Sequence, residues 1–358
     1  MKKLALIITL LTLSLAGCGL LPGAASPVQN LEITDSTGHT AQLTGLPERI
    51  AIAGKATVLV QDTIFLFQEA SERVIALENR KQSAYGFLPV VDPGLSDKQI
   101  FEINVGPEQI AAAQPDLVIM KNYLAESLGD PLEQIDIPVI YLDQETPGAF
   151  YQDVSVLGEV FGDPDRAQEI VDFYQSRVSR VEELTSGVEE RPSVLVIRYS
   201  EDGGEVAFSV PPVSWLQTSM VETAGGEPVW KELEASGGWT VVNLEQIAAW
   251  DPDQVYLIDY SGNASQVVES LKQNPIWNNL QAVQNDQLYA FAFDFYSWDQ
   301  PDTRWILGLE WLATKIAPDQ TAEIDILAEF NAFYQEMYFL DQETIDSQVL
   351  PLLSGDIP

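Results

Sequence analysis

Residues 108–118 read EQIAAAQPDLV, and residues 245–255 read EQIAAWDPDQV. Eight of these eleven positions are identical at an offset of 137. Each copy predicts a short helix that begins with a glutamate, ends before Pro-Asp and leads into an apolar strand, with the acidic residue at the helix end that favours an anion. A unit that occurs once in each half of a chain predicts two lobes of similar construction.

The segments around the two copies alternate between short apolar runs and helical patterns. Strands are expected at 50–53, 73–77, 116–120, 138–142, 193–199, 254–259 and 287–293, and helices at 58–69, 107–113, 123–134, 149–161, 215–224, 304–316 and 321–338. Such alternation predicts α/β lobes with parallel central sheets. A long helix from Asp163 or Asp165 to about Thr185 is expected to join them.

These patterns divide the chain into consecutive regions. We expect an N-terminal α/β lobe at 31–160, an inter-lobe segment with the long rigid helix at 161–190, and a C-terminal α/β lobe with terminal helices at 191–358, with the ligand cleft between the lobes. Residues 31–34 and 40–43 alternate and flank a turn, which predicts a small hairpin.

The composition excludes several classes of function. The 358 residues include 54 acidic and 18 basic side chains, a formal net charge of -36, and no nucleic-acid surface is expected without clustered Lys and Arg. The 8 Trp and 14 Phe argue against a disordered chain.

The first residues have the pattern of an export signal. Lys2-Lys3 precede an apolar run from Leu4 to Leu15 that is too short to span a bilayer. The following Leu15-Ala16-Gly17-Cys18 resembles the bacterial lipobox, which implies a lipoprotein signal peptide at 1–17 and acylation of Cys18. Residues 18–30 would then be the acylated cysteine and a flexible tether on the extracytoplasmic side of the membrane, in the periplasm or at the cell surface. The alternative is an ordinary secretory signal.

Residues for covalent or metal chemistry are scarce. The one His, His39, falls in the turn of the expected hairpin, and the single Cys allows no disulfide. Gly54-Lys55-Ala56-Thr57 lacks the preceding glycine of a phosphate-binding loop. We therefore expect no catalytic residues, no metal site and no cofactor, and the protein is not expected to be an enzyme.

Basic residues follow the ends of four expected strands. Ligands bind outside the carboxyl ends of strands in open parallel sheets, and the residues at these positions are Lys55, Arg80 with Lys81, Lys121 and Arg198. Each could simply pair with one of the many acids, but as a set they suggest a cationic cleft for an anionic ligand.

Aromatic residues are expected to form the walls of this cleft. The candidates are Tyr199, Trp215, Tyr260, Tyr296 and Trp298, together with Tyr85 and Tyr123. Core packing is the alternative, but the run 293–298 is followed by Asp299-Gln300-Pro301-Asp302 and has no obvious core to enter. Flat walls suit chelates with aromatic or macrocyclic faces.

Residues 31–318 resemble the substrate-binding proteins of the ABC importers for iron-siderophores, haem and cobalamin. The resemblance rests on the two repeated units and on three further motifs: Pro47-Glu48-Arg49-Ile50-Ala51, Ala224-Gly225-Gly226, and Trp277-x-x-Leu280-x-Ala282-Val283 leading into Leu288-Tyr289. It implies two α/β lobes linked by one rigid helix, with a ligand cleft between them that closes little on binding.

The resemblance also implies a function. A monomeric lipoprotein would capture a metal chelate, a ferric siderophore first of all, and deliver it to a permease dimer driven by a cytoplasmic ATPase. Haem, a corrinoid or an oxyanion such as molybdate are alternative ligands, and a surface enzyme or sensory lipoprotein is the alternative of another class. Glu108 and Glu245 match the acidic residues with which this group meets its permease, although both could simply complement a helix dipole.

Overall fold

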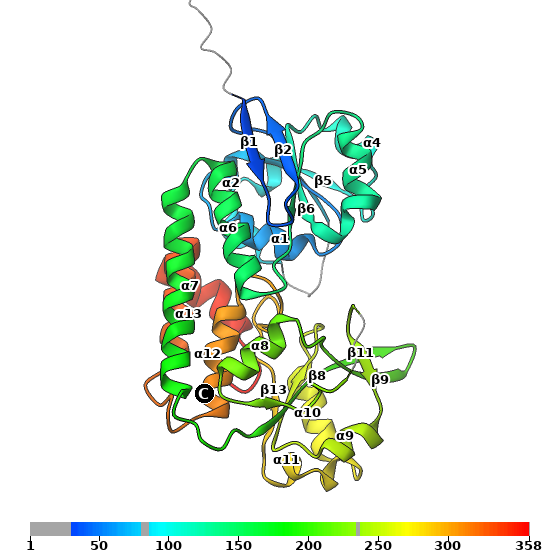
Figure 1. Ribbon diagram of the computed structural model, residues 1–358, viewed down its shortest axis with the longest axis vertical. Coiled ribbons are helices and arrows are strands. Elements are labelled where there is room, and N and C mark those ends of the chain that lie inside the picture. Colours follow the sequence, from blue (N-terminus) through cyan, green and yellow to red (C-terminus); the bar gives the residue numbers. More distant parts are fainter. Residues whose placement is uncertain (1–29, 80–85, 234–236, 358) are drawn as a thin grey trace, which may run out of the picture.

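The structure is a computed structural model that describes residues 30–79, 86–233 and 237–357 (Figure 1). Its N-terminal lobe has a parallel five-stranded sheet in the order β5-β4-β3-β6-β7. The strands are β3 (Ile50–Ile52), β4 (Val74–Glu78), β5 (Gln99–Phe101), β6 (Leu117–Lys121) and β7 (Val139–Leu142). Four of them were predicted, whereas β5 was not. The predicted hairpin forms as β1 (Leu31–Thr34) and β2 (Thr40–Leu43).

The helices of this lobe are α1 (Thr57–Ile64), α2 (Ala70–Arg73), α3 (Leu88–Val91), α4 (Pro107–Ala112), α5 (Asp130–Glu133) and α6 (Pro147–Phe161). The helical stretch predicted at 123–134 is present, but it changes its hydrogen-bonding pattern along its length. A 3-10 turn (Asn122–Leu124) and a π turn (Ala125–Gly129) precede α5. Pro131 contributes to this change because it has no backbone N–H for the helical ladder.

The C-terminal lobe has a mixed sheet in the order β11-β9-β8-β12-β13, with β10 beside β8. The strands are β8 (Ser193–Asp202), β9 (Glu205–Val210), β10 (Glu227–Pro228), β11 (Thr240–Val242), β12 (Gln254–Ile258) and β13 (Leu288–Ala290). β9 is antiparallel to both of its neighbours, which the parallel pattern did not predict. Gly203 and Gly204 have positive φ values of 60° and 87°, and they permit the tight turn from β8 back into β9.

The helices of this lobe are α8 (Leu216–Thr223), α9 (Leu244–Trp250), α10 (Ala264–Lys272) and α11 (Gln281–Gln284). The repeated unit is α4 with β6 in the N-terminal lobe and α9 with β12 in the C-terminal lobe. The aspartate of each Pro-Asp pair has the same structural role. Asp116 accepts hydrogen bonds from the amides of Glu48 and Arg49 at 2.9 Å, and Asp253 accepts one from the amide of Ser193 at 2.7 Å. Each carboxylate therefore ties its strand to the start of the neighbouring one.

The lobes are joined along one side by helix α7 (Pro164–Thr185), against which α12 (Trp305–Ile316) and α13 (Ile326–Tyr338) are packed (Figure 1). The chain then ends through α14 (Gln342–Thr344) and short turns. Arg166 near the start of α7 donates to the carbonyl of Leu66 at 3.1 Å and to that of Met337 at 2.9 Å. One guanidinium thus links the N-terminal lobe, α7 and α13, which makes the connection a small helical bundle.

Candidate ligand cleft

Arg198 is the cation around which the candidate site is built. It pairs with Ile258, the last residue of β12, and so lies where the parallel pairing of β8 with β12 ends, although β8 itself continues to Asp202. Its guanidinium carbon is 4.9 Å from the ring centroid of Trp239 and 6.0 Å from that of Tyr260. Trp239 also contacts the ring of Trp215 edge-on at 6.2 Å. The aromatic rings hold the guanidinium in place, and no residue of the described ranges forms an ion pair with it.

The hydrogen-bonding capacity of Arg198 is not fully used. No carboxylate in the described ranges forms an ion pair with it, and its buried Nε has no hydrogen-bond partner there. A buried donor without an acceptor costs about 1–3 kcal/mol. An anionic ligand at this position would supply the acceptor and recover that cost.

A cavity of about 380 Å³ lies beside Arg198 at the ends of β8 and β12. Its lining includes Tyr199, Glu201, Asp259 and Tyr260. Asp259 accepts hydrogen bonds from the amides of Ser261 and Asn263 at 3.0 Å, so its carboxylate shapes the loop before α10. The hydroxyl of Tyr199 donates to Glu201 at 2.8 Å. Both acids of the cavity therefore have partners other than Arg198.

The hydroxyl of Tyr260 is hydrogen-bonded to the buried carboxylate of Asp299. The hydroxyl donates to Asp299 at 3.0 Å, and Asp299 also accepts from Gln217 at 3.1 Å. Burial raises the pKa of Asp299 to about 6. Burial also raises the pKa of Tyr260 well above its usual value, with smaller contributions from Asp299 and from Glu145 after β7.

Two of the predicted cations, Lys55 and Lys121, belong to the N-terminal lobe, and they differ in exposure and in ion pairing. Lys55 is exposed just before α1, after Gly54, whose amide donates to the buried Glu78 at 2.6 Å. Lys121 is only 1 % exposed, and its Nζ lies 3.0 Å from Glu145 and donates to the carbonyl of Asp143. Lys121 therefore does not line the cleft as a free cation, contrary to the prediction, because Glu145 already neutralises it.

The aromatic loop at 293–298 was predicted as a cleft wall, and this is wrong for Tyr296 and Trp298. Tyr296 is 4 % exposed and Trp298 is 0 % exposed. Their burial is possible because the loop's acids have partners: Asp294 accepts from Trp298 Nε1 at 3.0 Å and from the hydroxyl of Tyr334 at 2.5 Å. The loop forms a core between the lobes in place of a wall of the cleft.

The centre of this core is the buried guanidinium of Arg304. It contacts Asp62 of α1 at 2.5 Å, Asp294 at 2.8 Å and Asp302 at 3.3 Å. Phe87 covers it, with the ring centroid 4.4 Å from the guanidinium carbon. Asp62 and Phe87 belong to the N-terminal lobe, so the cluster joins the two lobes beneath the cleft.

Residues 98–294 match the periplasmic binding protein family, and they include segments of both lobes and most of the cavity. The chain belongs to the periplasmic binding protein family. As a member of that family it is an extracytoplasmic, substrate-binding protein of the kind that serves ABC importers, and it is not an enzyme. In the described ranges, no helix combines the length and apolar character needed to cross a membrane.

Curated relatives of this periplasmic binding protein include an iron-uptake system-binding protein of Bacillus subtilis. It is 23% identical over 317 residues, which cover 82% of this chain and 92% of the relative. A molybdate-binding protein of Haemophilus influenzae is 21% identical over 256 residues, which cover 66% of this chain and 70% of the relative. These relatives differ in the ligand for which they are named.

Solved structures confirm the two-lobed fold. A periplasmic solute binding protein from Veillonella parvula superposes with a TM-score of 0.71 at 20% identity, covering 90% of this chain and 97% of that structure. The molybdate-bound Haemophilus influenzae protein superposes with a TM-score of 0.70 at 17% identity, covering 87% and 98%. Such low identities establish the fold of this periplasmic binding protein and leave its ligand open.

Glu108 and Glu245 occupy corresponding places in the two lobes. Each lies in the first turn of its helix, α4 or α9, and each is exposed. Both helices lie on the side of their lobe away from α7 (Figure 1). The two carboxylates are therefore available to a partner that spans both lobes.

Several residues named in the sequence analysis lie outside the described residues: Cys18, Arg80, Lys81 and Tyr85. Trp239 is a site residue that the sequence analysis missed. The glycines Gly237 and Gly238 directly before it were the available signal, because glycines beside a large aromatic residue mark a loop that can present it. In the described parts of the chain, no group of three or more His, Cys, Asp or Glu is placed to hold a metal ion.

Proposed function

We propose that this periplasmic binding protein captures an anionic metal chelate, most favourably a ferric siderophore, at the cavity beside Arg198. The observation that supports this proposal is the guanidinium of Arg198, which lies among aromatic rings with no carboxylate partner in the described ranges and with a buried Nε that lacks an acceptor. A chelate presents anionic oxygens and flat faces together, and Arg198 with Trp239 and Tyr260 complements both.

Ferric chelates fit the residues better than the alternatives do. A lone tetrahedral oxyanion would leave most of a cavity of about 380 Å³ and its aromatic walls without contact. Haem usually takes an axial Tyr, His or Met. The hydroxyls of Tyr199 and Tyr260 already donate to Glu201 and Asp299, and His39 is bound to Glu133 at 2.6 Å. The chain captures the chelate by its charge and shape, without chemistry of its own.

Lipid anchoring and delivery to a permease complete the proposal. Acylation of Cys18 would hold the monomer at the membrane, since two acyl chains on one residue anchor stably. Glu108 and Glu245 would each meet a basic pocket of one permease subunit, which would place the cleft over the translocation path. Such a contact supplies orientation more than affinity.

Ligand titration tests the cleft. Tryptophan fluorescence would be followed with a ferric catecholate, a ferric hydroxamate, haem, cobalamin and molybdate. Arg198→Ala should weaken binding of the preferred chelate tenfold or more, because a charge-assisted contact is worth about 1.5–3 kcal/mol. Arg191→Ala is the matched control, since Arg191 is exposed and its side chain donates to the carbonyl of Glu222, away from the cavity. Equal affinity in the wild type and Arg198→Ala would remove Arg198 from the site.

Transport tests the docking residues separately. The double variant Glu108→Ala with Glu245→Ala should bind a ferric chelate that has no alkyl or acyl side arm, and unfold, like the wild type, while uptake and stimulation of the ATPase collapse. The control pair is Glu72→Ala with Glu189→Ala, two exposed glutamates elsewhere on the surface. Normal uptake by the first double variant, or loss of its chelate binding, would contradict a docking role.

A further inference from the structure

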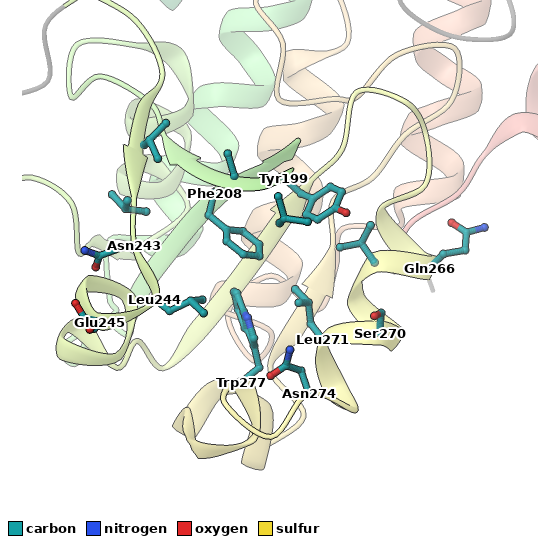
Figure 2. A pocket seen from close by; sticks show the side chains of 15 residues that line it. Tyr199, Phe208, Asn243, Leu244, Glu245, Gln266, Ser270, Leu271, Asn274 and Trp277 are labelled. Atoms are coloured by element: carbon teal, nitrogen blue, oxygen red, sulfur yellow. The ribbon is translucent and has the colours of Figure 1, made fainter. Parts of the chain in front are cut away.

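A second cavity, an apolar groove, lies in the C-terminal lobe next to the one beside Arg198. Figure 2 shows the groove on one face of the sheet, between α9 and α10. Its volume is about 860 Å³, within the range of about 300–1,000 Å³ that small-molecule sites occupy. We call it the C-lobe groove and define it by Val206, Phe208, Val241, Leu244, Leu271 and Trp277.

The floor and the rim of the C-lobe groove differ in exposure. Phe208 and Trp277 form the floor, with ring centroids 5.1 Å apart and exposed fractions of 8 % and 1 %. Val206 and Val241 stand at the rim and are 51 % and 70 % exposed. The groove therefore offers open apolar surface above a packed aromatic floor, and an apolar chain laid in it would lose contact with water.

The C-lobe groove adjoins the cavity beside Arg198. Tyr199 and Val267 line both cavities, so the two spaces are neighbours on either side of these side chains. The ring of Tyr199 packs against Phe208 at 5.9 Å, and its hydroxyl points to Glu201 in the polar cavity. Tyr199 thus lies between the cavity that contains the cation Arg198 and the C-lobe groove. Among the described residues that line the groove, Glu245 is the charged one.

We infer that the ligand of this protein is amphiphilic: an anionic chelate head rests against Arg198, and an acyl or alkyl tail passes Tyr199 into the C-lobe groove. This inference rests on the proposed function for its head group and adds the substrate class. The occupant is a small molecule because the groove shares the lining residues Tyr199 and Val267 with the candidate ligand cavity. The tail adds affinity through burial of its methylene groups, whereas the head adds selectivity through the charge of Arg198.

Matched chelates test the tail. A single hexadentate ferric tris-catecholate would be made with a methyl, butyl or octyl amide at one position away from the iron, and used below its micelle-forming concentration. Affinity should rise with chain length by up to about fourfold for each methylene that the groove covers. Equal affinities for the three chelates would overturn the inference and leave the receptor function standing. Absence of binding by any of them would overturn both.

Variants at the rim locate the tail. Val241→Asp introduces a charge at a residue that is 70 % exposed, so the fold should tolerate it. It should reduce binding of the octyl chelate by tenfold or more and leave the methyl chelate unchanged. Ile135→Asp is the control, since Ile135 is 49 % exposed in the other lobe.

An octyl chelate that binds to Val241→Asp as tightly as to the wild type would overturn the inference. Octyl binding unaffected by Arg198→Ala would overturn it too, because the groove would then hold an apolar ligand alone. Loss of transport in Val241→Asp with both chelates still bound normally would point to a permease segment in the groove and also overturn it.

Discussion

Asp302→Asn should leave the protein folded and make its stability less dependent on pH. Arg304 is completely buried with Asp62, Asp294 and Asp302 around it, and one cation cannot balance three carboxylates in a region of low dielectric. Burial raises the pKa of Asp302 to about 8. At neutral pH its carboxyl is therefore mostly protonated, and asparagine is a neutral side chain of the same size. The backbone amide of Arg304 donates a hydrogen bond to Asp302 Oδ1 at 2.7 Å, and Oδ1 of an asparagine at this position can accept the same hydrogen bond.

The direction of the pH effect follows from the raised pKa. Between about pH 4 and pH 8 the folded protein holds a proton on Asp302 that the unfolded chain releases. The stability from this group is complete at the acidic end and is lost as the pH rises through about 8. Within this window it contributes a slope of up to about 1.4 kcal/mol per pH unit. Asp302→Asn removes the contribution of this carboxyl group to the slope of unfolding free energy against pH. The pKa of Asp62 is also raised by burial, to about 6, so part of the slope should persist.

Urea unfolding at several values between about pH 4 and pH 8, followed by tryptophan fluorescence, measures this slope. Near pH 4 the variant should lie within about 1 kcal/mol of the wild type, and at pH 7 it should be more stable than the wild type by up to about 4 kcal/mol, three pH units at about 1.4 kcal/mol each. Asp319→Asn is the exposed control. Arg304→Met should instead lose about 3–5 kcal/mol, because it leaves buried carboxylates without their cation. If Asp302→Asn loses as much as Arg304→Met and keeps the wild-type slope, Asp302 is ionised and the reasoning is refuted.

Three further predictions concern other parts of the chain. Cys18→Ser should move the protein from the membrane to the soluble fraction, and mass spectrometry of a wild type without lipid would contradict acylation. Gly308→Ala should destabilise the protein by about 1–3 kcal/mol, because the new Cβ would lie 2.2 Å from the carbonyl oxygen of Trp298; Gly187→Ala, with open space around it, is the control, and equal melting temperatures would contradict the close approach. Asp116→Ala and Asp253→Ala should each cost about 1–2 kcal/mol through the strand ties that they share, and a cost in one lobe only would show that the two copies are not equivalent.

The local patterns of the chain predicted the lobes well, because helix and strand periodicity depend on neighbouring residues. The repeated unit, the hairpin at 31–43 and the long helix α7 were all expected and are present. The turn at Gly203 and Gly204 also carried a local signal, the sequence Asp-Gly-Gly-Glu, which was not recognised. Strand β9 and its antiparallel pairing were missed for that reason.

The site was harder to predict because its charges are balanced by residues distant in sequence. Arg198 was predicted from a strand expected to end at 199, whereas β8 continues to Asp202, and the equally plausible Lys121 is neutralised by Glu145. The aromatic loop at 293–298 is flanked by acids and was expected at the surface. Its burial depends on Asp62, Phe87 and Tyr334, which only the folded arrangement of the two lobes brings to Arg304. No local pattern contains that information.

Native mass spectrometry of the protein tests most directly whether it captures a ferric chelate beside Arg198. The protein would be mixed with a panel of a ferric catecholate, a ferric hydroxamate, haem, cobalamin and molybdate in equal amounts. We expect a single one-to-one adduct with the mass of a ferric chelate, which Arg191→Ala keeps and Arg198→Ala loses. An adduct with molybdate or haem in place of the ferric chelates, or a ferric adduct that Arg198→Ala retains in full, would contradict the proposed capture of an anionic ferric chelate beside Arg198.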